Sequence, residues 1–221
     1  MEKLIENIAY CIEFGKVNQK SPFPPDMKGK EGADELTQKA LEMGYKAKEI
    51  LDEALFPAMS RVGEKFKVNR IFVPQVLMSA KAMNASMAHL KPFFQTGEVM
   101  QKGTFVIGTV AGDLHDIGKN LISMMVEGAG WKVIDLGTDV KTKQFIEKIE
   151  ENPDAIVGMS ALLTTTMANM EKTVKELKEN SPKTRIIIGG APVTDQFRQE
   201  IGADFYAPDP NGAVEYLNKI S

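Results

Sequence analysis

The sequence predicts an α/β protein in which an N-terminal four-helix bundle precedes a doubly wound parallel sheet of five strands. Before about residue 100, apolar residues recur at helical spacing. After it, short β-rich runs alternate with longer helical runs, and the apolar runs 105–107 and 186–188 are continuous, as in strands covered on both faces. We expect a helical domain over 1–95, a linker over 96–103 and an α/β domain over 104–221.

Four apolar stripes predict the helices of the first domain. The stripes are Leu4, Ile5, Ile8 and Ile12; Leu36, Ala40, Leu41 and Met43; Ile50, Leu51, Ala54, Leu55, Met59 and Val62; and Val76, Leu77, Ala80, Met83, Met87 and Leu90. The last stripe follows Pro74, a residue tolerated in a first helical turn. The stretch 21–32 is rich in proline and glycine, which predicts a connector.

Five β-rich runs predict the strands of the second domain, at 104–110, 132–136, 155–160, 185–188 and 204–207. Their alternation with helices is typical of a flavodoxin-like, Rossmann-type fold. In such folds ligands bind beyond the carboxyl ends of the strands, near the point where the strand order reverses. The loops that follow the first, third and fourth strands are therefore where chemistry is expected.

Composition limits the classes of partner. The chain has 221 residues and a formal net charge of -3, with 27 Lys and Arg against 30 Asp and Glu, so no positive field favours nucleic acid or an anionic membrane. A single cysteine, Cys11, excludes an intrachain disulfide and a cysteine-rich zinc site. The opening segment does not read as a signal peptide, and no run is apolar for long enough to span a bilayer. We expect a cytoplasmic protein.

The loop after the first strand carries His115, one of two histidines in the chain, and Asp113. Neutral imidazole is a good ligand for a transition metal, and the carboxylate is close enough to accept the proton on the other ring nitrogen and fix the tautomer. An isolated Asp-x-His triplet is also compatible with an ordinary turn. One histidine is too little for a zinc site built from protein alone, whereas a macrocycle that fills the equatorial positions of its metal, such as cobalamin, needs one protein ligand.

Other loop residues suggest the sides of a slot. Gly112 lets the chain turn as it leaves the strand, and Gly118 opens a helix where a side chain would obstruct a bulky ligand. Ser160 offers a hydroxyl at a strand end, and Gly189-Gly190 allows close approach to the backbone. The three threonines 164–166 suit either contact with a polar group or capping of the next helix.

The motif Asp113-x-His115-x-x-Gly118, followed by Ser160-x-Leu162 and Gly189-Gly190, resembles the signature of cobalamin-binding domains that hold the cofactor base-off with histidine on cobalt. The stretch 108–120 resembles the cobalamin-binding region of methionine synthase and the corrinoid proteins of methylamine, methanol and methoxyarene methyltransferase systems. The resemblance covers most of the chain. It implies that the cofactor is cobalamin or a related corrinoid and that its nucleotide tail enters a slot lined by Ser160, Leu162, Gly189 and Gly190.

The resemblance also implies roles for individual residues. His115 is the expected metal ligand, and His115, Asp113 and Thr166 form the expected relay, with threonine where methionine synthase has serine. Phe66 and Val73 match positions of the helical cap over the upper face of the corrin, where methionine synthase has leucine in place of Val73. The expected cofactor contacts are Asp113, His115, Asp116, Ile117, Gly118, Ser160, Leu162, Thr164, Thr166, Gly189, Gly190, Phe66 and Val73.

The implied function is that of a methyl carrier, which does not catalyse a reaction alone. It accepts a methyl group on cobalt(I) from a substrate-specific methyltransferase and delivers it from methyl-cobalt(III) to a second methyltransferase, of the tetrahydrofolate or coenzyme M type. A reductive activase is the third implied partner. The helical cap must move for partners to reach the methyl group, with the segment 93–103 as the expected hinge.

Three other classes of protein share parts of this pattern. A cobalamin-dependent mutase subunit would share the cofactor motif, and so would a cobalamin-sensing regulator, although nothing in the leading helices reads as a basic DNA-binding element. A receiver-type signalling domain shares the α/β architecture and has acidic residues after the first strand, as Asp113 and Asp116 are here. It also needs an aspartate near the end of the third strand, where this chain has Ser160.

Overall fold

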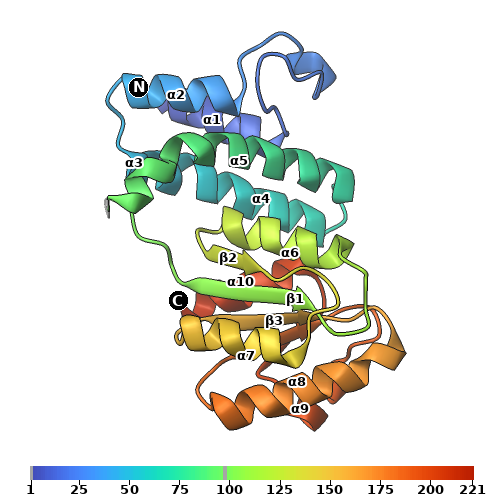
Figure 1. Cartoon of the computed structure of the whole chain (residues 1–221). Coiled ribbons are helices and arrows are strands. Elements are labelled where there is room, and N and C mark those ends of the chain that lie inside the picture. Colours follow the sequence, from blue (N-terminus) through green and yellow to red (C-terminus); the bar gives the residue numbers. More distant parts are fainter. Residues whose placement is uncertain (1, 97–98) are drawn as a thin grey trace. The chain divides into compact units, whose positions relative to one another are not determined.

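Figure 1 shows the computed structural model of the chain, which describes residues 2–96 and 99–221. The chain divides into two compact units: residues up to Gln101 with Gly128–Gly130, and Lys102–Glu127 with Trp131–Ser221. The division falls within the predicted linker 96–103, of which residues 97 and 98 lie outside the described residues; the predicted domain bounds stay a prediction. No helix in the described part of the chain is long and apolar enough to cross a membrane.

The first unit is helical, as the apolar stripes predict. Its elements are α1 (Glu2–Glu13), the short 3-10 helix η1 (Pro25–Met27), α2 (Ala33–Glu42), α3 (Ala47–Ile50), the π-helical segment η2 (Leu51–Leu55), α4 (Phe56–Lys67) and α5 (Val73–Gln95). The segment η2 joins α3 to α4 into one continuous helix. The described part of the unit therefore has four main helices, which are α1, α2, the combined α3-η2-α4 and α5, and the predicted four-helix arrangement is confirmed (Figure 1). Ile8, Leu55 and Leu90 are completely buried, so the stripes contribute to its core, but Met43 of the second stripe is exposed.

Polar contacts also join α2 to α5. The Thr37 hydroxyl donates to Ser86 Oγ at 2.8 Å, both groups being buried. Near them, His89 Nε2 lies 2.6 Å from a carboxylate oxygen of Asp34. The second histidine of the chain is therefore engaged in a contact within the bundle.

The second unit is a parallel sheet of five strands in the order β2-β1-β3-β4-β5. The strands are β1 (Thr104–Thr109), β2 (Lys132–Asp135), β3 (Ile156–Ser160), β4 (Ile186–Gly189) and β5 (Phe205–Ala207). The helices are α6 (Ile117–Gly128), α7 (Thr142–Glu151), the 3-10 helix η3 (Thr164–Thr166), α8 (Met167–Asn180), α9 (Asp195–Ile201) and α10 (Pro210–Ile220). This order is that of a flavodoxin-like fold, which confirms the predicted fold class.

Alternate residues of each strand point to opposite faces of this sheet. On one face, Val106, Val157 and Ile188 belong to a continuous apolar core that includes Phe145 of α7 and Val174 of α8. The other face is turned toward α6 and α10, where strand residues line a small pocket together with Ile122 and Ala213. The loops after β1 and β3 meet at the carboxyl edge, since these strands are neighbours in the sheet.

Candidate cofactor site

The loop after β1 has a defined shape. Gly112 has φ +83°, a conformation that favours glycine, so the chain turns sharply directly after the strand. The Asp113 amide donates to the Val110 carbonyl at 3.1 Å, and the Thr109 hydroxyl donates to the His115 carbonyl at 2.8 Å. These bonds hold both ends of the segment that presents His115.

Asp113 is the centre of the site. Its side chain is completely buried, and its carboxylate accepts five hydrogen bonds. Oδ1 accepts from the amide and the Nδ1 of His115, at 3.1 and 2.8 Å, while Oδ2 accepts from the amides of Leu162 and Leu163, at 2.7 and 3.1 Å. The fifth donor is Thr166. Burial alone raises the pKa of Asp113, but the bonds from Leu162 and His115 outweigh it and hold that pKa far below its usual range.

The His115 ring is held by Asp113 through its Nδ1 atom. A carboxylate only accepts hydrogen bonds, so the neutral ring carries its proton on Nδ1 and keeps the lone pair on Nε2. The side chain is 51% exposed, and Nε2 contacts no donor or acceptor among the residues that the structure describes. The predicted contact between His115 and Asp113 is present, and the ring offers one free ligand atom.

Thr166 completes the chain of contacts that the sequence predicts. Its hydroxyl is buried, lies 2.9 Å from Asp113 Oδ2 and 2.8 Å from the Leu163 carbonyl, and donates to these oxygens. The alternative role as a capping side chain is wrong for this residue, because Thr166 precedes α8 without accepting a backbone hydrogen bond. A threonine hydroxyl therefore reaches the position that a relay from His115 requires.

Exposed aliphatic side chains occur in the two loops that meet at Asp113. Leu114 and Ile117 are each 73% exposed, and Leu162 and Leu163 are 43% and 41% exposed. Exposed apolar groups gathered at one site are typical of a binding surface. Sequence reasoning named Ile117 and Leu162 but missed Leu114 and Leu163; the available signal was the presence of leucines inside otherwise polar loops.

Two glycines of the motif have different surroundings. A Cβ added to Gly118, in the first turn of α6, would meet nothing within 4 Å, so its bare backbone leaves open space beside His115. A Cβ on Gly190 would lie 1.8 Å from the Ala161 carbonyl oxygen, and its φ is +123°. The close approach of the Ala161 backbone is therefore enough to require glycine at position 190, with or without a ligand contact.

A pocket of about 20 Å³, called the slot below, lies on the face of the sheet toward α6 and α10, and only part of the predicted slot lining belongs to it. Ser160 and Gly189 line it, while Leu162 and Gly190 do not. The Ser160 hydroxyl is half-buried and bonds to no described residue. The pocket also includes Phe105, Ile107, Ile122, Gly158, Met159, Ile187, Ile188, Ala207 and Ala213, which sequence reasoning did not name.

Asp139, in the loop after β2, is a second residue that sequence reasoning missed. Its Oδ1 accepts from the Gly112 amide at 2.6 Å, and its own amide donates to the Asp113 carbonyl at 3.0 Å. It takes φ +52°, which is uncommon for a residue with a side chain. The ammonium of Lys141 and the Gly112 amide hold the pKa of Asp139 below its usual range, so it braces the histidine loop as a carboxylate.

The remaining predicted residues are less constrained. Asp116 is exposed and accepts a hydrogen bond from the Asn120 side chain at 3.0 Å, and Thr164 is exposed in η3. Phe66, in α4, and Val73, the first residue of α5, are half-buried in the helical unit. The roles predicted for these residues stay predictions, as do the ligand and contact roles of the others.

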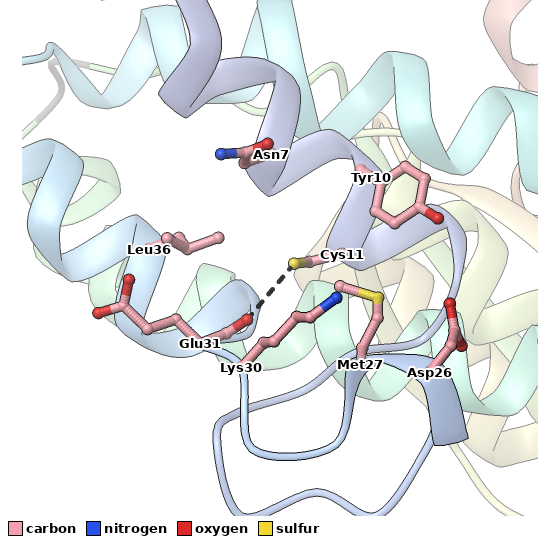
Figure 2. A pocket seen from close by; sticks show the side chains of 8 residues that line it. All are labelled: Asn7, Tyr10, Cys11, Asp26, Met27, Lys30, Glu31 and Leu36. Atoms are coloured by element: carbon pink, nitrogen blue, oxygen red, sulfur yellow. Dashed lines mark hydrogen bonds between the residues drawn. The ribbon is translucent and has the colours of Figure 1, made fainter.

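A separate hollow of about 340 Å³ lies in the helical unit (Figure 2). Its lining consists of Asn7, Tyr10, Cys11, Asp26, Met27, Lys30, Glu31 and Leu36. Cys11 is buried there, with Sγ 3.9 Å from the Glu31 carbonyl oxygen. Burial raises the pKa of this thiol to about 11, which makes it a poor metal ligand at neutral pH. None of the predicted site residues lines this hollow.

The geometry around His115 fits a corrinoid. The described residues contain no group of three or more His, Cys, Asp or Glu that could hold a metal ion by themselves. One free imidazole nitrogen, an aliphatic rim and an uncovered helix start suit a broad, methyl-rich ring. The receiver interpretation fails, because β3 ends in Ser160 where such a domain needs an aspartate, and the buried Asp113 carboxylate is already engaged by five hydrogen bonds.

Comparison with known families agrees with this reading. A family described as "B12 binding domain" matches residues 103–215, and a second family with the same description matches residues 29–91. The chain belongs to the B12-binding family. The two matches together cover most of both units, so the cofactor of this corrinoid protein is cobalamin or a related corrinoid.

Relatives are similar over most of their length. A corrinoid protein of Desulfitobacterium hafniense (strain Y51) is 41% identical over 191 residues, covering 84% of this chain and 88% of the relative. Trimethylamine corrinoid protein 1 of Methanosarcina acetivorans is 38% identical over 192 residues, covering 85% and 89%. The methanol:cobalamin methyltransferase complex MtaBC from Methanosarcina barkeri matches with a TM-score of 0.83 and 29% identity, covering 99% of this chain and 80% of that chain. A cobalamin-binding protein from Desulfitobacterium hafniense DCB-2 matches with a TM-score of 0.75 and 28% identity over the full length of both chains.

Proposed function

We propose that this protein is a methyl carrier, with His115 as the lower ligand to cobalt. The observation that carries the proposal is the buried Asp113 carboxylate, which binds the Nδ1 side of the imidazole and leaves Nε2 free beside exposed aliphatic side chains. Relatives named as trimethylamine and dimethylamine corrinoid proteins support the assignment to methyltransferase systems. The bound corrinoid supplies cobalt, which takes up a methyl group and gives it up again.

The residues of the chain hold and tune the ligand. Asp113 keeps a proton on Nδ1 of His115, which fixes the ring orientation and raises the donor strength of Nε2. Thr166 and two backbone amides hold the other carboxylate oxygen, so the carboxylate cannot rotate away. Where Nε2 is not bound to a metal it could take a proton, and the adjacent Asp113 carboxylate would stabilise the positive ring that results.

The slot is the proposed place of the nucleotide tail. Its mouth lies at the carboxyl ends of β3 and β4, where the Ser160 hydroxyl is available to a ring nitrogen and Gly189 presents only backbone. The exposed residues Leu114, Ile117, Leu162 and Leu163 lie outside the slot and suit contact with the corrin ring.

The proposed partners follow from the same role. They are a substrate-specific methyltransferase, an acceptor methyltransferase of the tetrahydrofolate or coenzyme M type, and a reductive activase. The match to the methanol:cobalamin methyltransferase complex supports a methyltransferase partner. A net charge of -3 supports the expectation that neither nucleic acid nor a membrane surface is a partner, and the cytoplasmic location stays a prediction.

Reconstitution tests the proposal. Apoprotein is titrated with hydroxocobalamin, reduced with titanium(III) citrate and treated with methyl iodide, and absorption spectra are recorded at each step. We expect stoichiometric uptake, a spectrum that changes on alkylation, and loss of the methyl group to a cognate acceptor methyltransferase. His115→Ala removes the histidine-bound spectrum, while His89→Ala serves as the matched control because His89 pairs with Asp34 inside the bundle. Failure of the reduced holoprotein to accept a methyl group contradicts the proposal.

A further inference from the structure

Small residues form a trough across the sheet on the face toward α6 and α10. Two rows of the ladder that point to this face cross it: one is Ile107, Gly158 and Ile187, and the other, two residues further along the strands, is Ser160, Gly189 and Ala207. The second row lies nearer the carboxyl edge, where His115 is. The first row places a glycine between two isoleucines. The trough therefore runs from the carboxyl edge of the sheet, at Ser160, toward the middle of the strands. The side chains of Ile107 and Ile187 form its apolar sides.

Phe105 closes the inner end of this trough. Its ring covers Gly158, where an added Cβ would lie 2.3 Å from Phe105 Cζ. Ile122 of α6 and Ala213 of α10 contribute to the lining from the helices. Among the described residues of the lining, Ser160 alone has a polar side chain. The peptide groups of β1, β3 and β4 are engaged in the parallel ladders, so the interior offers no free donor or acceptor.

We propose that this trough selects corrinoids by their lower base, favouring a benzimidazole over adenine. The inference rests on the proposed function, since it assumes that the nucleotide tail enters the trough. Beyond its glycosidic nitrogen, a benzimidazole has one ring nitrogen, which a single hydroxyl at the mouth can satisfy. An adenine base adds two further ring nitrogens and an amino group, which would be buried against aliphatic side chains.

The volume of the trough supports the same preference. About 20 Å³ is room for about one water molecule, so an entering base must displace the walls. The walls are side chains such as Ile122 and Ile187, and moving them breaks no hydrogen bond of the protein. A benzimidazole makes apolar contacts with those side chains. The additional ring nitrogens and amino group of adenine would lose their hydration there without gaining a hydrogen bond. We expect adeninyl cobamide to bind roughly 10- to 100-fold more weakly than cobalamin.

Equilibrium titrations of the full-length apoprotein test this. The dissociation constants of cobalamin, adeninyl cobamide and cobinamide, which lacks a base, are compared under the same conditions. Cobalamin should bind most tightly, and each bound form should show the His115-dependent spectrum. Equal affinity for the two complete cobamides, both bound through His115, overturns the selectivity and leaves the proposed function standing. Equal affinity for cobinamide and cobalamin shows that the trough does not hold the base, and also overturns the selectivity.

A matched pair of variants at Ile187 tests the physical cause. Ile187→Val and Ile187→Thr have nearly the same shape, and only the second places a hydroxyl in the wall. We expect Ile187→Val to keep the preference for cobalamin and Ile187→Thr to reduce it several-fold, because the hydroxyl opposes the apolar base and offers a partner to adenine. Circular dichroism and urea unfolding establish that both variants fold. The same ratio of dissociation constants in both variants contradicts the proposed cause.

Discussion

The two faces of the sheet differ in what their side chains do. Toward α7, α8 and α9, the strands present large aliphatic residues such as Val106 and Ile188, which merge with the helices into one closed core. Toward α6 and α10, the corresponding positions include Gly158 and Gly189, and a trough results. Two neighbouring residues of β4 illustrate this: Ile186 belongs to the closed core, and Ile187 lines the trough. Under the proposed function, the first face serves packing alone, whereas the second face also holds the nucleotide tail of the cofactor.

The largest expected effect is on the packed face. Ile186 is completely buried in the core and does not line the trough, so Ile186→Ala should lower the free energy of unfolding by about 2–5 kcal/mol through the cavity it leaves. Urea unfolding measures this, and corrinoid titration of the folded protein should give an unchanged dissociation constant. A large loss of cofactor affinity at unchanged stability would show that the two faces are not specialised in this way.

At the carboxyl edge, Asp113→Asn should lower the free energy of unfolding by about 2–4 kcal/mol, because the new amide group faces donors that the carboxylate had satisfied. The pKa of Asp113 is lower in the folded chain than in the unfolded chain. Its contribution is therefore complete above about pH 4 and is lost as the pH falls further. Unfolding measured from pH 3 to 7 should show a steeper acid loss in the native protein than in the variant. Parallel pH profiles would contradict this account.

Substitutions of Asp139 test whether the loop that carries His115 depends on the hydrogen bond between the Gly112 amide and the Asp139 carboxylate. Asp139→Asn retains an acceptor for the Gly112 amide and tolerates positive φ, while Asp139→Ala does neither. Replacing a residue that orients a metal ligand commonly lowers metal affinity about 10- to 100-fold. We therefore expect roughly 10-fold weaker corrinoid binding for the alanine variant and a smaller loss for the asparagine variant. Equal binding by both variants and the native protein would remove Asp139 from the site.

The smallest expected effect on stability is at Gly118. Because nothing lies within 4 Å of an added Cβ, Gly118→Ala should leave the free energy of unfolding unchanged or raise it by up to about 1 kcal/mol, as alanine favours the helix. The same methyl group would obstruct a ligand beside His115. Corrinoid affinity should fall while stability does not, and an unchanged affinity would mean that Gly118 makes no contact.

Much of the fold was predictable because its signals are local. The run predicted at 104–110 corresponds to β1 at Thr104–Thr109, and the continuous run 186–188 lies within β4. The contact between His115 and Asp113 was also predictable, because two residues of separation leave little freedom in a tight turn. Local periodicity and short-range geometry determine these features.

Other features depend on contacts distant in sequence. Asp139 braces Gly112 across 27 residues, and no pattern in its own segment indicates this. The trough was missed because Phe105, Gly158 and Ala213 come together only through strand register and helix packing. The motif glycine Gly190 was assigned to ligand approach, although a close contact with Ala161 is enough to require it. Side-chain packing between strands was not accessible from one sequence.

Isotope labelling tests the central claim most directly. Protein grown with ¹⁵N-histidine is reconstituted with unlabelled cobalamin and reduced to the cobalt(II) state, and its electron paramagnetic resonance spectrum is compared with that of unlabelled protein. If His115 Nε2 is the lower ligand, the nitrogen splitting changes from a triplet to a doublet, and His115→Ala loses the histidine-derived splitting while His89→Ala retains it. A triplet that persists in the labelled protein would show that nitrogen of the cofactor itself occupies that position, and would contradict the account.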